Sequence, residues 1–237
     1  MALEDLQTVR GDAVQGLLEH SRFPETAGYY LEEGESALVH HGDLRVPGDL
    51  VIPLHDDGPF HLVVLGDLLV DGRYADCDDP ACSVLVTGSM RAQVVVTNGR
   101  LEVGGDLTAD LVLGDYNDHL CQIGGTLRCR VFFPEEHFFE AGSAEIDLPL
   151  GLTNHRLELA DGGELVCADE AIEEDPDTGD ERELYAFYRS LFAEELVSAD
   201  EVHEDGSVFD VYVSTARANG LIREGRPVRA SRQEPVE

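Results

Sequence analysis

The nonapeptide Leu-Glu-Val-Gly-Gly-Asp-Leu-Thr-Ala at residues 101–109 decides the fold, because similar stretches occur four more times in the 237-residue chain. The shared pattern is apolar-x-apolar-x-Gly-polar-apolar-x, followed by an apolar or small residue. The five copies are Leu44–Ile52, Leu62–Val70, Val84–Ala92, Leu101–Ala109 and Cys121–Cys129. Self-similarity at about twenty residues is typical of stacked supersecondary units, each of which buries its apolar face against the next.

Apolar and polar residues alternate on both sides of each glycine, which indicates β-strands with one buried face. A glycine inside such a run marks a bend, so each copy is predicted to be two short strands joined at a corner. Stacked copies would align their inner side chains in columns. One predicted column contains the residues two positions before each glycine: Val46, Val64, Val86, Val103 and Ile123.

The spacing of the glycines distinguishes between repeat architectures. Gly48, Gly66, Gly88, Gly105 and Gly125 lie 18, 22, 17 and 20 residues apart. A strict hexapeptide solenoid would need multiples of six throughout. The sequence therefore predicts an all-β fold with helical additions, a parallel β-solenoid (β-helix) of about five to seven irregular coils with helical segments at its ends.

Three regions are expected from the pattern. Residues 1–36 form an N-terminal helical cap, because their apolar residues recur at helical spacing. Residues 37–167 form the β-solenoid. Residues 168–237 contain an acidic connector, a C-terminal helical cap and a tail, and the amphipathic stretch Glu181–Val197 is predicted as the helix that covers an open solenoid end.

The charge of the chain restricts its partners. The chain has 49 acidic residues and 16 basic residues, and all of the basic residues are arginine, so the formal net charge is −33. Such a charge repels nucleic acid and anionic membranes and suits another protein with a basic surface. Residues 1–20 include acidic residues and lack the apolar region of a signal peptide, so a cytoplasmic location with reduced thiols is expected.

The sequence indicates no catalytic or cofactor-binding motif, so we expect a protein that is not an enzyme and needs no cofactor. Cys121 and Cys129 fall on inner repeat positions and are expected to be small buried hydrophobic residues, as is Cys167. Cys77 and Cys82 resemble half of a metal site or are free thiols. A second pair at suitable spacing is missing, so no metal is predicted.

The segments inserted between the copies are the candidate partner-binding sites, because solenoids commonly bind through insertions on one face. They combine acidic residues with aromatic residues and histidine. The alternative is that the phenylalanines of Phe132–Phe139 pack an irregular coil and the rest are solvated. The candidate residues are Asp76, Asp78, Asp79, Asp115, Tyr116, Asn117, His119, Glu135, Glu136 and His137.

The repeats also resemble those of a known family. The stretches LRVPGDL at 44–50, VVLGDLLV at 63–70, LEVGGDLTA at 101–109 and CQIGGTLRC at 121–129 are similar to bacterial proteins labelled polymer-forming or bactofilin-like. A stand-alone cytoplasmic β-solenoid group of that label is the closer likeness, and residues 114–119 and 220–228 share it. The resemblance implies the fold and carries over no functional residues.

Two functions follow as expectations. The first is a monomeric or small-oligomeric protein-binding solenoid, of which one form is an immunity or inhibitor protein that neutralises a basic partner such as a toxin domain. The second is a bactofilin-like cytoskeletal scaffold that polymerises end to end. The expected helical caps favour the first, because a covered end cannot stack.

Overall fold

The computed structural model describes residues 6–18, 31, 35–52, 60–77, 82–114, 119–134, 137–149, 157–160, 163–167, 185–186, 188–190, 192–202, 208–214, 217, 221, 224 and 226–227. The chain divides into two compact units, Met1–Ala171 and Ile172–Glu237. Each unit is described by itself.

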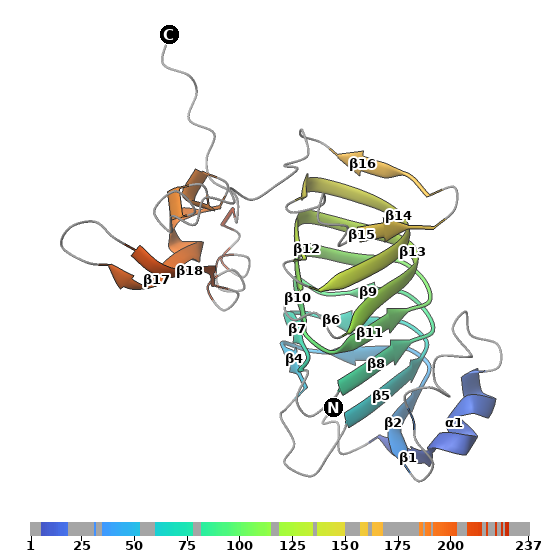
Figure 1. Ribbon diagram of the computed structural model, residues 1–237. Helices are drawn as coiled ribbons and strands as arrows, with labels where there is room; N and C mark the ends of the chain where they lie inside the picture. Colours follow the sequence, from blue (N-terminus) through green and yellow to red (C-terminus); the bar gives the residue numbers. More distant parts are fainter. Residues whose placement is uncertain are drawn as a thin grey trace. The chain divides into compact units, whose positions relative to one another are not determined.

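The first unit is a parallel β-solenoid, as the repeats predict (Figure 1). Its first face consists of β2 (Ser36–His41), β5 (Phe60–Leu65), β8 (Cys82–Val86), β11 (Arg100–Val103), β13 (Leu120–Phe133), β14 (Phe138–Pro149) and β15 (Leu157–Leu159). The second face consists of β3 (Leu44–Val46), β6 (Leu68–Val70), β9 (Met90–Arg91), β12 (Leu107–Gly114), the middle of β13 and β14, and β16 (Leu165–Cys167). Each strand pairs in parallel with the equivalent strand of the next coil.

Each coil before β15 also has a third strand, which the sequence pattern did not predict. This face is built from β4 (Leu50–Val51), β7 (Arg73–Ala75), β10 (Val94–Thr97) and the ends of β12, β13 and β14. Its inner residues Tyr74, Val95, Val112 and Phe132 are completely buried. They close the apolar core on the side that a two-strand repeat would leave open.

The predicted interior column is confirmed for four of its five members. Val64, Val86, Val103 and Ile123 are cross-strand neighbours in successive coils, and each is 3% exposed or less. The prediction for the fifth member, Val46, is wrong, because this residue pairs with Val70 on the second face.

In the first coil, the column position predicted for Val46 is occupied by His40, which pairs with Val64. The matching corner glycine is Gly42 rather than Gly48, since the Gly42 N–H donates to the Leu65 carbonyl. The physical reason is that the first coil carries a histidine where the other copies carry an apolar residue. The alternation of apolar and polar residues around Gly42 could therefore not be recognised in the sequence.

The later coils follow the predicted irregular continuation. β14 pairs with β13 along most of its length, with a register shift between Ile123 and Thr126. Phe132 and Phe139 are buried and meet edge to face with ring centroids 4.9 Å apart. This confirms the alternative in which these phenylalanines pack the irregular coil, although Phe138 is 41% exposed.

The N-terminal region differs from the predicted helical cap. Gln7–Arg10 forms the strand β1, antiparallel to β2, and Gly11–Leu18 forms the helix α1. Val9, expected on a helix, lies on β1 because this strand pairs with the edge of β2. Val14 and Leu18 of α1 pack with outward-facing residues of the first face, namely Val39, Val63 and Leu85. The region thus covers one flank as well as one strand edge.

The second unit contains helical residues at 185–186 and 188–190, the 3₁₀-helix η3 (Glu194–Leu196), and an antiparallel pair of β17 (Val197–Val202) and β18 (Val208–Val213). The predicted helix Glu181–Val197 is confirmed at residues 185–186 and 188–190, but its predicted end is wrong, because Val197 starts a strand opposite Val213. The alternation in VFDVYV at 208–213 was the available signal. The cover over a solenoid end stays a prediction, and the predicted acidic connector Asp169–Glu183 lies outside the described residues.

Candidate functional site

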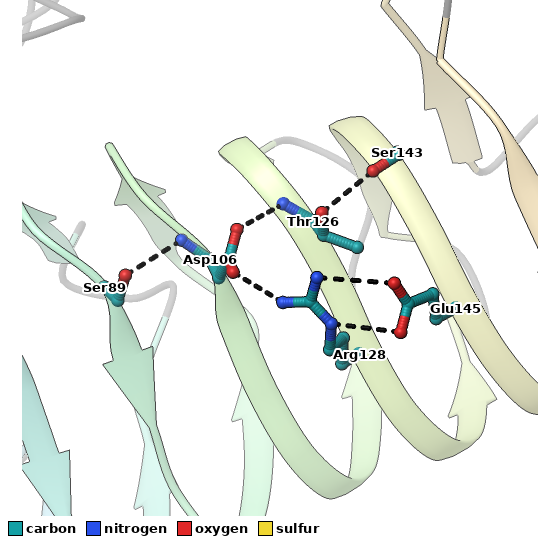
Figure 2. Close-up of polar contacts among 6 residues, drawn as sticks. All are labelled: Ser89, Asp106, Thr126, Arg128, Ser143 and Glu145. Atoms are coloured by element: carbon teal, nitrogen blue, oxygen red, sulfur yellow. Dashed lines mark hydrogen bonds and ion pairs between the residues drawn. The ribbon is translucent and has the colours of Figure 1, made fainter.

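A polar residue follows each corner glycine and binds the next coil. Asp106 accepts a hydrogen bond at Oδ1 from the Thr126 N–H at 2.8 Å, and its own N–H donates to Ser89 Oγ at 3.1 Å (Figure 2). The same link joins the other coils: Asp67 N–H to Asp43 Oδ1, Ser89 N–H to Asp67 Oδ1, and the hydroxyls of Thr126 and Ser143. The aspartates of the repeat are therefore structural links between coils.

Arg128 is the centre of a charged network on the second face (Figure 2). It donates to Asp106 Oδ2 at 2.5 Å and to the two carboxylate oxygens of Glu145 at 3.0 and 3.3 Å. These residues lie beside a groove of about 640 Å³ whose lining includes Asp110, Arg130 and Asp147 as well as Arg128 and Glu145. We call it the mixed-charge groove.

The network changes the proton affinity of its members. The Thr126 N–H and the Arg128 guanidinium stabilise the ionised form of Asp106, so the pKa of this carboxyl lies below its usual 3.8. Glu145 and Asp106 raise the pKa of Arg128 in turn. Both charges remain in place around neutral pH.

Replacing Asp106 by asparagine tests this network. Asparagine keeps an oxygen for the Thr126 N–H but loses the charge beside Arg128, so we expect stability at pH 7 to fall by about 0.5 kcal/mol, as for a solvent-accessible pair. Because the pKa of Asp106 is lowered by folding, its contribution is present above pH 3.8 and is lost as the pH falls below that value. Urea unfolding of both proteins at pH 7 and pH 3 measures the difference, and a gap that is unchanged at pH 3 would contradict the assignment.

A second row of polar side chains lies on the outer side of the first face. Glu102 pairs with Gln122, Gln122 with Glu140, and Glu140 with Glu158 in successive strands. Gln122 Nε2 donates to Glu140 Oε2 at 2.7 Å. Arg100 donates to Gln122 Oε1 at 3.3 Å and also to Glu102. Glu102 is fully buried, whereas Glu140 is half-buried and Glu158 is exposed.

The last three members of this row border a smaller groove of about 170 Å³. Its walls are formed by Gln122, Glu140 and Glu158 together with small residues at the coil corner, including Gly124 and Gly142. We call it the acidic groove. Parallel strands are about 4.8 Å apart, so the rigid coils hold two carboxylates and an amide at regular spacing.

The structure places the predicted partner-binding residues unevenly. Asp76 is 7% exposed and accepts hydrogen bonds from the Tyr74 and Thr97 hydroxyls and the Asn98 and Gly99 N–H groups. His137 is fully buried, with its ring 5.3 Å from that of Phe139. Asp76 and His137 are therefore removed from the candidate partner-binding residues, because a buried side chain presents no surface to a partner.

The remaining candidates are not brought together by the described structure. His119 is half-buried and directly precedes β13. The others lie outside the described residues: Asp78, Asp79, Asp115, Tyr116, Asn117, Glu135 and Glu136. The polar rows that contain Arg128 and Glu140 were not predicted from the sequence. A signal for the second row was present, because aligning the copies on their glycines places Gln122 and Glu102 at the same outward position of the pattern.

The five cysteines, all of which lie within the described residues, form no disulfide bond with one another. Cys121 and Cys129 are buried as predicted, and Cys167 is partly buried. Burial raises the pKa of the Cys121 thiol well above its usual value, which keeps it protonated. Within the described ranges, His, Cys, Asp and Glu side chains form no group of three that could hold a metal ion.

Taken together, the coils and their outer rows define the first unit as a parallel β-solenoid scaffold with ordered charged faces. Comparison with protein-family models, with curated proteins and with solved structures finds no match for this chain. The likeness to bactofilin-like proteins thus remains a hypothesis based on the repeat motifs. In the described part of the chain, no helix has the length and apolar character needed to span a membrane.

Proposed function

We propose that this protein is a non-catalytic binding protein whose β-solenoid presents the acidic groove to a basic surface of another protein. The observation that carries the proposal is the in-register row of Gln122, Glu140 and Glu158 along one groove. The stacked sheet fixes the backbone that carries these side chains, and the hydrogen bond from Gln122 Nε2 orients Glu140, so less conformational entropy is lost when a partner docks.

The charge of the whole chain supports the same proposal. A net charge of −33 increases the association rate of a basic partner and disfavours acidic ones. One form of this function is that of a cytoplasmic immunity or inhibitor protein, which would cover the basic active surface of a toxin domain. The protein would act as a monomer or small oligomer.

A bactofilin-like polymer is the second candidate, and one observation favours it. Among the described strands, β3 and β4 pair with one neighbour each, and so do β15 and β16. Such open edges can add further strands. Against a polymer, β1 already occupies the edge of β2.

The proposal is tested by capturing partners with the full chain at low salt, identifying them and reconstituting the complex from purified proteins. We expect a basic partner whose affinity falls at least about tenfold between 50 and 500 mM salt, because screened charges contribute less. The double variant Glu140→Gln, Glu158→Gln should weaken binding by about tenfold, since two interface charges are removed.

Asp71→Asn is the matched control, because Asp71 is an exposed acid at the other end of the solenoid, paired with Arg45. It should leave the affinity within about twofold of the wild type. Equal losses in the two proteins would contradict a role for the acidic groove. Filaments at micromolar protein in negative-stain microscopy would instead favour the polymer.

A further inference from the structure

In the described part of the chain, β15 and β16 are the last strands of the solenoid. Within the described residues, each of these strands pairs with β14 on one side and with no strand on the other. Figure 1 places both at the end of the unit opposite β1. A backbone edge of this kind can accept another strand through main-chain hydrogen bonds.

The apolar columns are also uncovered at this end. Leu165 is 37% exposed, whereas Leu107, Leu127 and Ala144 of the earlier coils in the same column are completely buried. Leu157 and Leu159 end the columns of Phe139 and Ala141 and are half-buried. Covering these side chains would remove apolar surface from water, which is favourable.

The negative charge at this end determines which side chains an added strand should carry. Glu158 lies between Leu157 and Leu159 on β15 and is exposed, and Glu140 is its neighbour in β14. An added strand would place alternate side chains over the two leucines and the intervening one beside Glu158. A basic side chain at that position pairs with the carboxylate, and an acidic one is repelled.

The opposite end of the solenoid shows that such an edge accepts a strand. β1 lies along β2 with Val9 opposite Ala37, and both side chains are buried. The edge of β2 in a second copy is therefore already filled, so β15 cannot extend onto it. This disfavours a second copy as the occupant of β15.

We propose that an extended segment of the partner, with the pattern apolar–basic–apolar, adds to β15 as a further strand of the solenoid. This inference rests on the proposed function, because it assigns the binding mode of the same basic partner. The apolar residues cover Leu157 and Leu159, and the basic residue pairs with Glu158.

A fluorescein-labelled heptapeptide of alternating valine and arginine is the probe, and anisotropy with the full chain is the measurement. We expect it to bind at least about tenfold more tightly than two control peptides. One control has the same residues in block order, with the arginines together, and the other has an interior valine replaced by proline. Equal binding of all three would overturn the proposal, since charge alone would then explain it.

Two protein variants with the same change of charge locate the binding edge. Glu158→Lys should reduce the affinity for the alternating peptide by about tenfold, because the paired charge is reversed. Glu164→Lys, at an exposed position just before β16, should change it by about twofold or less. Circular dichroism checks folding, and Glu158→Gln replaces Glu158→Lys if the latter unfolds.

The remaining outcomes separate this inference from the proposed function. If the alternating peptide fails to bind the full chain, or if Glu164→Lys weakens it as much as Glu158→Lys, the edge is not the site. A reconstituted complex that still depends on Glu140 would then preserve the proposed function. Self-association in sedimentation velocity that is lost in Glu158→Lys would assign the edge to a second copy and overturn the inference.

Discussion

Replacing Gly66 by alanine is expected to lower the free energy of unfolding of the solenoid by about 3 kcal/mol, as for severe overpacking of a close contact. A Cβ atom at this position would lie 2.5 Å from the Gly42 carbonyl carbon, 2.6 Å from its oxygen and 2.8 Å from the Asp43 nitrogen. All three are backbone atoms, so the clash is relieved only if two coils separate at the corner. The loss should appear as a decrease of roughly 6–12 °C in the melting temperature measured by circular dichroism.

Gly16→Ala is the matched control, because it makes the same chemical change. Gly16 lies in α1, and among the described residues no atom outside the neighbouring helix backbone lies within 4 Å of the point that an alanine Cβ would occupy there. Alanine favours the helical conformation over glycine by up to about 1 kcal/mol, so this variant should be as stable as the wild type or slightly more stable. A similar loss in both variants would contradict the close approach of the corners as the cause.

The corner contact also explains why the fold could be predicted from the sequence. Each coil must place a residue without a side chain over the glycine of the coil before, as Gly88 lies over Gly66 and Gly125 over Gly105. The inner columns between corners are occupied by apolar residues in nearly every coil. Both features recur from coil to coil, so they are visible as a repeat in one sequence.

The parts that failed are those that the repeat does not constrain. The first corner was misassigned because His40 occupies an apolar position in its column. The third face was missed because its inner residues, such as Tyr74 and Phe132, lie beyond the end of each nonapeptide copy and differ in type from coil to coil. Val9 was assigned to a helix because the pairing of β1 with β2 joins residues that are distant in sequence.

The candidate site was harder to predict than the fold. Alternation shows which side chains point outward, but it does not show which of these another segment covers. Val63 and Leu85 point outward and are buried under β1 and α1, whereas Glu158 points outward and is exposed. Asp76 has the composition of a surface residue and is buried within a hydrogen-bond network. Coverage of this kind depends on contacts between distant segments.

Replacing Asp76 by alanine is expected to destabilise the solenoid by about 4 kcal/mol, because four donors would lose their acceptor in a buried site. The donors are the hydroxyls of Tyr74 and Thr97 and the backbone N–H groups of Asn98 and Gly99, at 2.6–2.9 Å from the carboxylate. Urea unfolding followed by circular dichroism measures the loss. Tyr74→Phe, which removes one of the four bonds, should cost about 1 kcal/mol.

Asp71→Ala is the control for this prediction, since Asp71 and its partner Arg45 have side chains that are 46% and 71% exposed. Its removal should change stability by about 0.5 kcal/mol or less. If it costs as much as Asp76→Ala, the effect of Asp76 reflects charge in general rather than the buried network.

The protonation of Asp76 gives this prediction a second readout. Burial raises the pKa of the carboxyl above its usual 3.8, although the four hydrogen bonds oppose the change. The unfolded chain therefore releases this proton at lower pH than the folded chain does, so the contribution of Asp76 to stability is largest below pH 3.8 and decreases as the pH rises through the folded pKa. Asp76→Asn cannot titrate and should lack this part of the pH dependence. Relative to Asp76→Asn, the wild type should therefore lose unfolding free energy as the pH rises from 3.8. If the wild type gains unfolding free energy relative to the variant instead, the hydrogen bonds outweigh burial.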